Sequence, residues 1–127
     1  DCLRSRGEDL ELELPSGRWL KYFNIQTLQY MSGELLRGTR RTSLYGGKLT
    51  ENITQAVARD VFAEGMVRLV DAGHTIAWHV HDECILEVPE DFDDTESVLS
   101  LITQTPEWLP GCPISADAKY AQHYLKG

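Results

Sequence analysis

Two imidazoles and two carboxylates stand within five residues of this chain, at His79, His81, Asp82 and Glu83. Adjacent carboxylates repel one another unless a cation or solvent relieves them, so a divalent metal site is physically reasonable there. Hard oxygen ligands suit Mg²⁺, which takes one or two protein carboxylates and completes its octahedron with water and substrate phosphates. A zinc site would use the two histidines, which share a strand face at i and i+2, plus a third ligand. The spacing alone does not decide between a Mg²⁺ site, a zinc site and an exposed turn without a metal.

Two β-rich runs flank this cluster and must position it. Residues 74–80 alternate between larger apolar and smaller or polar side chains, and residues 84–88 form a second β-rich run. Because so few residues separate the runs, they predict a β-hairpin. The charged residues then lie at its tip or just inside its second strand.

A proline-free stretch over residues 50–72 precedes the hairpin and predicts a long helix. Thr50 is suited to be its N-cap, and Gly73 stands where a C′ glycine belongs. Apolar residues as far as Val70 fall on several faces, which predicts that the helix is covered on more than one side. The first half of the helix carries a polar stripe at Asn52, Gln55 and Arg59.

The N-terminal part reads as a hairpin followed by loops. Residues 10–14 alternate with period two, residues 15–18 are turn formers, and residues 19–23 are a second extended run. Residues 26–31 read as a short strand. Glycines then predict loops as far as Lys48.

Length and composition bound the architecture. The chain has 127 residues, 42% of them hydrophobic and 25% charged, which suffices for one packed core and predicts a single domain over residues 1–127. After the central hairpin we expect a short helix near residues 97–103 and a last strand over residues 114–120. The predicted class is α+β, with an antiparallel sheet, a long packed helix and a hairpin at the charged cluster.

Charge divides unevenly along the chain. The net charge is −8, which argues against general affinity for a polyanion, but residues 1–48 hold eight basic and six acidic side chains while residues 49–127 hold four and fourteen. The N-terminal part can therefore offer one locally basic edge to a nucleic-acid backbone. Its basic cluster is Arg37, Arg40 and Arg41, just upstream of Lys48.

Neither a membrane span nor a disulfide framework is indicated. No apolar run approaches the ~18 residues that a span needs, and the first residues, Asp1 to Arg4, lack the apolar region typical of a signal peptide. The cysteines, Cys2, Cys84 and Cys112, are odd in number and widely spaced, which is typical of reduced thiols. We expect a soluble, intracellular protein with no membrane partner.

Several motifs together resemble the C-terminal palm region of family A DNA polymerases, especially the bacteriophage branch. They occur in the family's order and spacing over most of the chain, with the HDE segment resembling polymerase motif C. The matching segments are residues 14–18 (LPSGR), 45–52 (YGGKLTEN), 55–60 (QAVARD), 79–83 (HVHDE), 106–108 (PEW), 111–114 (GCPI) and 124–126 (YLK).

The resemblance implies roles for individual residues. Asp82 would ligate the catalytic Mg²⁺ ions, with Glu83 as an auxiliary carboxylate, in a two-metal transfer of a nucleotidyl group to a primer 3′-OH. His81 would lie near the primer terminus, and Gln55 would donate to minor-groove acceptors of the base pair. The residues implied to help position the DNA backbone are Asn52, Lys48 and Arg59.

The resemblance also implies partners. Primer–template DNA and a deoxynucleoside triphosphate would be the substrates, and the location would be the cytoplasm, that of a bacterial host for a phage protein. The family's second metal-binding aspartate (motif A) and its fingers lysine and tyrosine (motif B) are not among these 127 residues. We therefore expect the chain alone to be inactive, and to act when joined to the remaining polymerase covalently or as a split subunit.

Three further expectations stay open. A divided palm would leave apolar surface exposed, so the isolated chain would self-associate. A noncatalytic DNA-binding or protein-docking module with a palm fold would be indifferent to Asp82. A small metal-dependent hydrolase would use His79, His81, Asp82 and Glu83, and would turn over by itself.

Overall fold

The computed structural model describes residues 3–6, 9–28, 32–37 and 40–124. Contacts divide the chain into two compact units, Asp1–Ala58 and Arg59–Gly127. The long helix α1 (Gly46–Asp71) contributes its first half to the N-terminal unit and its second half to the C-terminal unit. The predicted α+β class is confirmed, with two antiparallel sheets, a long helix and a hairpin at the charged cluster. The expectation of a single domain stays a prediction.

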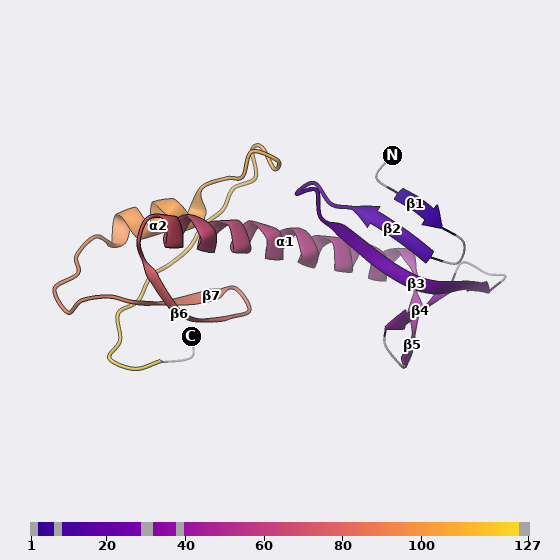
Figure 1. Cartoon of the computed structure of the whole chain (residues 1–127), viewed down its shortest axis with the longest axis horizontal. Coiled ribbons are helices and arrows are strands. Elements are labelled where there is room, and N and C mark those ends of the chain that lie inside the picture. The colour runs from indigo at the N-terminus through magenta and orange to yellow at the C-terminus, as the bar shows by residue number, and fades with distance from the viewer. Residues whose placement is uncertain (1–2, 7–8, 29–31, 38–39, 125–127) are drawn as a thin grey trace. The chain divides into compact units, whose positions relative to one another are not determined.

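A five-stranded antiparallel sheet forms most of the N-terminal unit (Figure 1). Each strand pairs with the strand that follows it in the chain, so the sheet is a simple meander. The strands are β1 (Leu3–Arg6), β2 (Asp9–Glu13), β3 (Trp19–Leu28), β4 (Ser32–Arg37) and β5 (Arg40–Leu44).

The predicted N-terminal hairpin is confirmed as the pair β2–β3. Its register sets Leu10 opposite Tyr22 and Leu12 opposite Leu20, so the apolar residues of the alternating pattern share one face. Tyr22 is buried, and Leu10, Leu20 and Leu49 of α1 pack against it. This cluster joins the sheet to the first half of the helix.

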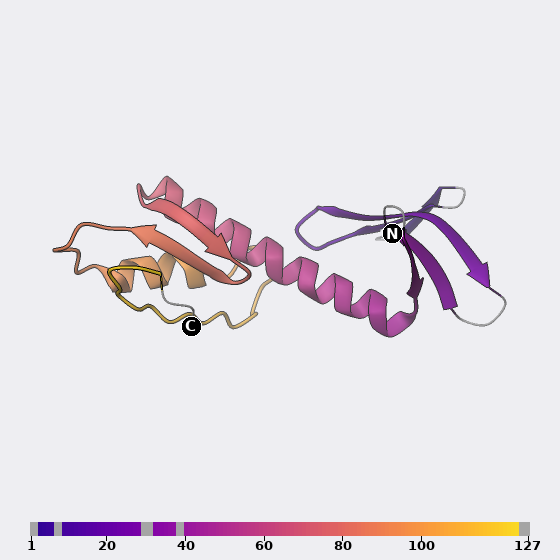
Figure 2. The same cartoon turned by 90° about the horizontal axis from the view of Figure 1, so that it is seen from below.

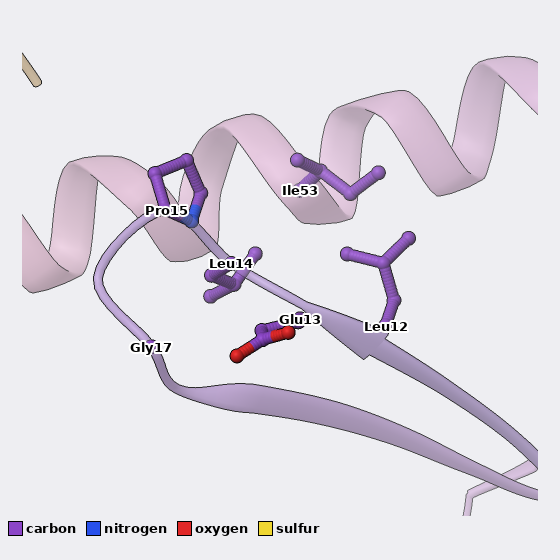
Figure 3. Close-up of a pocket in the computed structure, with 6 residues that line it drawn as sticks. All are labelled: Leu12, Glu13, Leu14, Pro15, Gly17 and Ile53. Carbon is purple, nitrogen blue, oxygen red and sulfur yellow. The ribbon is translucent and has the colours of Figure 1, made fainter. Parts of the chain in front are cut away.

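The turn between β2 and β3 is anchored to α1 as well. Gly17 adopts a φ of 83°, which a side chain would resist, and its amide donates to the Leu14 carbonyl at 2.8 Å. Arg18 Nη2 donates to the Ala56 carbonyl at 3.2 Å. Leu14 is 2% exposed. Figure 3 shows Leu12 and Pro15 extending toward the helix; the pocket there has about 520 Å³ and is lined by Leu12, Glu13, Leu14, Pro15, Gly17 and Ile53.

The predicted loops before the helix were wrong. β4 and β5 occupy residues 32–37 and 40–44, and Gly33 lies within β4 without ending it; residues 38–39 lie outside the described part. The helix begins at Gly46, so Thr50 is not its N-cap and its hydroxyl donates to the Gly46 carbonyl at 2.9 Å. The expected strand over residues 26–31 belongs to β3 as far as Leu28; residues 29–31 lie outside the described part.

The C-terminal unit packs the second half of α1 against α2 (Thr95–Thr103). A Cβ on Gly65 would lie 3.1 Å from the Ile102 carbonyl oxygen, so the absent side chain permits the close approach of the two helices. Arg68 donates to the carbonyls of Leu101 and Gln104, each at 2.8 Å, and thereby satisfies the C-terminal end of α2. Glu64 accepts from both Arg68 Nη1 and Trp108 Nε1, at 2.9 and 2.7 Å.

Helix α1 ends where the sequence predicts. Gly73 has a φ of 94°, its amide donates to Val70 at 2.9 Å, and the His74 amide donates to Leu69 at 3.0 Å. These two bonds form a Schellman motif and satisfy carbonyls of the last turn. Leu69 is fully buried, but Val70 is 55% exposed, so the expectation that the helix is covered on several sides was wrong at Val70.

The remaining elements are the strands β6 (Thr75–Val80) and β7 (Glu83–Glu87), which run in opposite directions in Figure 2. They pair with each other as a separate two-stranded sheet. The predicted short helix is confirmed as α2, and the structure shows Asp94 as its N-cap. The expected strand over residues 114–120 was wrong, because that segment has no ladder partner.

Two further sequence expectations concern membrane spans and thiols. Neither helix in the described residues has the length and apolar character required to cross a membrane. Cys84 and Cys112 are free thiols, and burial raises the pKa of Cys84; Cys2 lies outside the described residues.

Candidate functional site

The HDE segment (His81, Asp82 and Glu83) forms the tip of the β6–β7 hairpin. The ladder pairs Val80 with Glu83, so a loop of only two residues, His81 and Asp82, connects the strands. All three residues of the segment are exposed. The sequence prediction is therefore confirmed: the first two charged residues lie in the turn, and Glu83 begins the second strand.

His81 adopts a left-handed backbone conformation, with a φ of 52°. Two-residue hairpin loops favour a positive φ at their first position, because that conformation matches the twist of the flanking strands. Glycine normally supplies it, and a residue with a Cβ meets a steric penalty there. The pairing of β6 with β7 thus holds mild backbone strain at the residue next to the two carboxylates.

A bulge in β6 changes which side chains share a face. The ladder shifts between Ile76 and Trp78, so Ala77 is the extra residue and Trp78 is 65% exposed. His81 lies outside the strand, so it does not share a strand face with His79 as the zinc reading requires. Within the described ranges, no three His, Cys, Asp or Glu side chains gather into a group that could hold a metal ion.

Asp82 and Glu83 therefore offer two carboxylate ligands from consecutive residues, and no third ligand side chain of the described residues joins them. Such a donor set fits Mg²⁺, which needs only one or two protein carboxylates when phosphates and water complete its octahedron. It does not fit a closed zinc site, which needs four ligands that include nitrogen or sulfur. The hairpin tip has the chemistry of part of a Mg²⁺ site.

Glu83 has a partner that the sequence did not indicate. The Tyr124 hydroxyl donates to Glu83 Oε2 at 3.1 Å, across 41 residues of chain. This hydrogen bond is the largest cause of a raised pKa at Tyr124, with burial and the Glu83 charge acting in the same direction.

The other predicted residues follow one face of α1, because Lys48, Asn52, Gln55 and Arg59 are separated by four, three and four positions. The first three belong to the N-terminal unit, and Arg59 begins the C-terminal unit that also contains the HDE hairpin. Lys48, Gln55 and Arg59 are exposed wholly or in part, and Asn52 is half-buried.

Each of these helix residues has a neighbour within the chain. Lys48 Nζ forms a salt bridge of 2.9 Å with Glu51, which raises the pKa of Lys48. Gln55 Nε2 donates to the other oxygen of Glu51 at 3.5 Å, so one carboxylate joins both predicted DNA ligands. Asn52 Nδ2 donates to the Tyr22 hydroxyl at 3.5 Å, and the Arg59 guanidinium lies 5.7 Å from the Phe62 ring centroid.

Sequence reasoning missed Glu51, Tyr22 and Tyr124. Glu51 was detectable, since it stands three residues after Lys48 and four before Gln55, the separations at which helical side chains meet. The two tyrosine contacts are long-range, and no local pattern points to them. Of the basic cluster at residues 37–41, the structure describes only the backbone, in β4 and β5.

The fold and the site define an α+β chain with two consecutive carboxylates exposed at the tip of a tight hairpin. The chain is 38% identical over 128 residues to a DNA polymerase of Bacillus phage SP02, in a match that covers 92% of this chain and 20% of the phage protein. The chain thus spans about a fifth of the length of this curated relative. No family model and no solved structure matches the chain. The match supports a fragment of a DNA polymerase.

The left-handed conformation of His81 predicts a difference between two substitutions. His81→Gly and His81→Ala both remove the imidazole, but only glycine accepts the positive φ without a steric penalty. We expect His81→Gly to be more stable than His81→Ala by about 1 kcal/mol, after the greater flexibility of unfolded glycine is allowed for. Urea unfolding of the two variants measures this difference. Equal stability would contradict the assignment of strain to His81.

Proposed function

We propose that this chain is the C-terminal palm part of a family A DNA polymerase and that it supplies motif C to the active site. The observation that carries the proposal is the pair of consecutive carboxylates, Asp82 and Glu83, at the exposed tip of a tight hairpin. It occurs in a chain that aligns over 92% of its length with a phage DNA polymerase. The proposed reaction is template-directed transfer of a nucleotidyl group to a primer 3′-OH.

In this role the hairpin tip holds two oxygen ligands out from the strands. Asp82 would bind Mg²⁺ as the main protein ligand from this chain, and Glu83 would assist it. Bound Mg²⁺ would activate the primer hydroxyl and stabilise the leaving pyrophosphate. His81 immediately precedes Asp82 in the turn, and its imidazole would contact the primer terminus. The two-residue turn favours the reaction by fixing the backbone of these side chains before DNA binds.

The polar face of α1 would contact the DNA. Gln55 would donate to minor-groove acceptors that every Watson–Crick pair presents, so it would test the shape of a pair without reading sequence. Lys48 and Arg59 would contact phosphates, with Asn52 beside them. Because Glu51 holds both Lys48 and Gln55 in this structure, DNA would exchange these intrachain contacts for contacts with nucleotide groups.

Activity would require the rest of the polymerase. A two-metal site needs more carboxylate ligands than the hairpin tip provides, and the chain corresponds to only 20% of the phage relative. We propose that the remaining polymerase, covalently attached or associated as a subunit, supplies a second metal-binding aspartate and the fingers residues. Primer–template DNA and a deoxynucleoside triphosphate are the proposed substrates.

Exposed apolar side chains support a protein partner. In the C-terminal unit Val67, Val70 and Trp78 are 57%, 55% and 65% exposed. A contiguous exposed apolar patch is typical of a surface that another chain covers, and we propose that these three side chains belong to one. We propose that the remaining polymerase covers this surface. In the isolated chain, a second copy of the chain would cover it instead.

Sedimentation of the isolated chain tests this partner surface. We expect a concentration-dependent dimer that Trp78→Ser weakens several-fold, because the substitution removes the largest of these exposed side chains. Tyr45→Ser, at an exposed aromatic residue of the N-terminal unit, is the matched control and should leave the equilibrium unchanged. A monomer at every concentration would contradict self-association.

Primer extension in Mg²⁺ tests the proposed function. We expect no extension by the 127-residue chain, extension once the chain is joined to the remaining polymerase, and a loss of roughly a thousandfold with Asp82→Ala, because a principal metal ligand is removed. Asp91→Ala removes the same charge from an exposed position outside the hairpin tip and should leave the rate unchanged. Extension that is indifferent to Asp82→Ala would refute the catalytic role and favour a noncatalytic module.

A further inference from the structure

The C-terminal segment is fixed at two tyrosines, and the second of them contacts the candidate site. Residues 112–124 contain neither helix nor strand. Tyr120 shares a hydrogen bond with Thr95 at the start of α2, and its hydroxyl donates to the Phe92 carbonyl at 3.4 Å. Four residues later, the Tyr124 hydroxyl donates to Glu83 Oε2 at 3.1 Å. The segment therefore connects the start of α2 with the tip of the hairpin.

Glu83 needs an orienting partner more than Asp82 does. The backbone of the two-residue loop fixes the short side chain of Asp82 to within few rotamers, whereas Glu83 has an additional rotatable bond and lies in solvent. Ordering a free glutamate side chain opposes any binding that uses it. A hydrogen bond from Tyr124 to one carboxylate oxygen would restrict those rotamers in advance.

The hydrogen bond also leaves the carboxylate able to bind a cation. Tyr124 occupies Oε2, and no described contact engages Oε1. Carboxylates that ligate metals are commonly held by a hydrogen-bond donor in this way, which sets the orientation of the oxygen facing the ion. A tyrosine hydroxyl suits this use because it donates without bringing a competing positive charge.

We propose that Tyr124 is a positioning residue that orients Glu83 for a divalent cation shared with Asp82. This inference rests on the proposed function, since it assigns a supporting residue to the same metal-binding tip. In this role Tyr124 would act through Glu83 and not directly on the reacting groups. A hydrogen bond that only anchored the C-terminal segment would have the same geometry, so the experiment must separate a positioning role from an anchoring role.

Tyr124→Phe removes the hydroxyl and keeps the ring, and Tyr120→Phe is the matched control at the other anchor of the segment. Side-chain scalar couplings of Glu83, measured by NMR without metal, report its χ1 distribution. We expect one dominant rotamer in the wild type and in Tyr120→Phe, and averaging over several rotamers in Tyr124→Phe.

Mn²⁺ then serves as the probe of metal binding, through paramagnetic broadening of the amides of residues 81–83. We expect Tyr124→Phe to raise the Mn²⁺ concentration for half-maximal broadening by roughly threefold to tenfold, which is at or below the lower limit for outer partners of metal ligands because this partner is exposed. Tyr120→Phe should leave that concentration unchanged.

The outcomes distinguish the inference from the proposed function. Tyr124→Phe with wild-type couplings and a wild-type Mn²⁺ midpoint would overturn the inference alone, provided that Asp82→Ala abolishes the broadening. Equal effects of both tyrosine substitutions would also overturn it, since they would report general loosening of the chain end. No broadening at residues 81–83 of the wild type would refute the metal site, and the inference with it.

Discussion

The candidate site depends on one constraint, the two-residue loop that closes the β6–β7 hairpin. Pairing of Val80 with Glu83 leaves only His81 and Asp82 to reverse the chain, and His81 takes a positive φ as a result. The same turn exposes the consecutive carboxylates of Asp82 and Glu83 to solvent, where water and salt screen their repulsion. The strands supply the rigidity, and a divalent cation would convert the repulsion at the tip into attraction.

Intrachain contacts determine which groups of this chain are available to a ligand. Glu51 lies between Lys48 and Gln55 on α1 and contacts both, so the two side chains proposed to contact DNA are held in place in its absence. At the hairpin, Tyr124 engages one oxygen of Glu83. The two contacts of Glu51 are exposed and therefore weak enough to be exchanged for contacts with a ligand. The Tyr124 contact leaves Oε1 of Glu83 available, so a cation could bind there without breaking it.

The sequence predicted the elements whose determinants are local. The central hairpin follows from alternation and short spacing, and the end of α1 from Gly73, which carries the φ that a helix C-terminus requires. The start of α1 was predicted four residues late, since Gly46 and Gly47 have low helix propensity and tertiary packing of Leu49 on Tyr22 overrides it.

The remaining errors and omissions concern partners far along the chain. Residues 114–120 contain only two strand formers, Ile114 and Tyr120, and a strand forms only where an edge is available to pair with. Likewise, Asp82 and Glu83 could be chosen as candidate ligands from their spacing, whereas the contact of Glu83 with Tyr124 joins residues 41 positions apart. Such contacts depend on packing, which single-sequence patterns do not encode.

The central claim is that the hairpin tip binds a catalytic metal ion when the polymerase is assembled on DNA. Fe²⁺ bound in place of Mg²⁺ reduces added hydrogen peroxide to hydroxide and a hydroxyl radical, which cleaves the backbone beside the ion, and added ascorbate returns the Fe³⁺ to Fe²⁺. The chain joined to the remaining polymerase, with primer–template DNA and nucleotide, should be cleaved at residues 81–83, and excess Mg²⁺ should protect it. Cleavage that spares residues 81–83 while primer extension proceeds would contradict the claim.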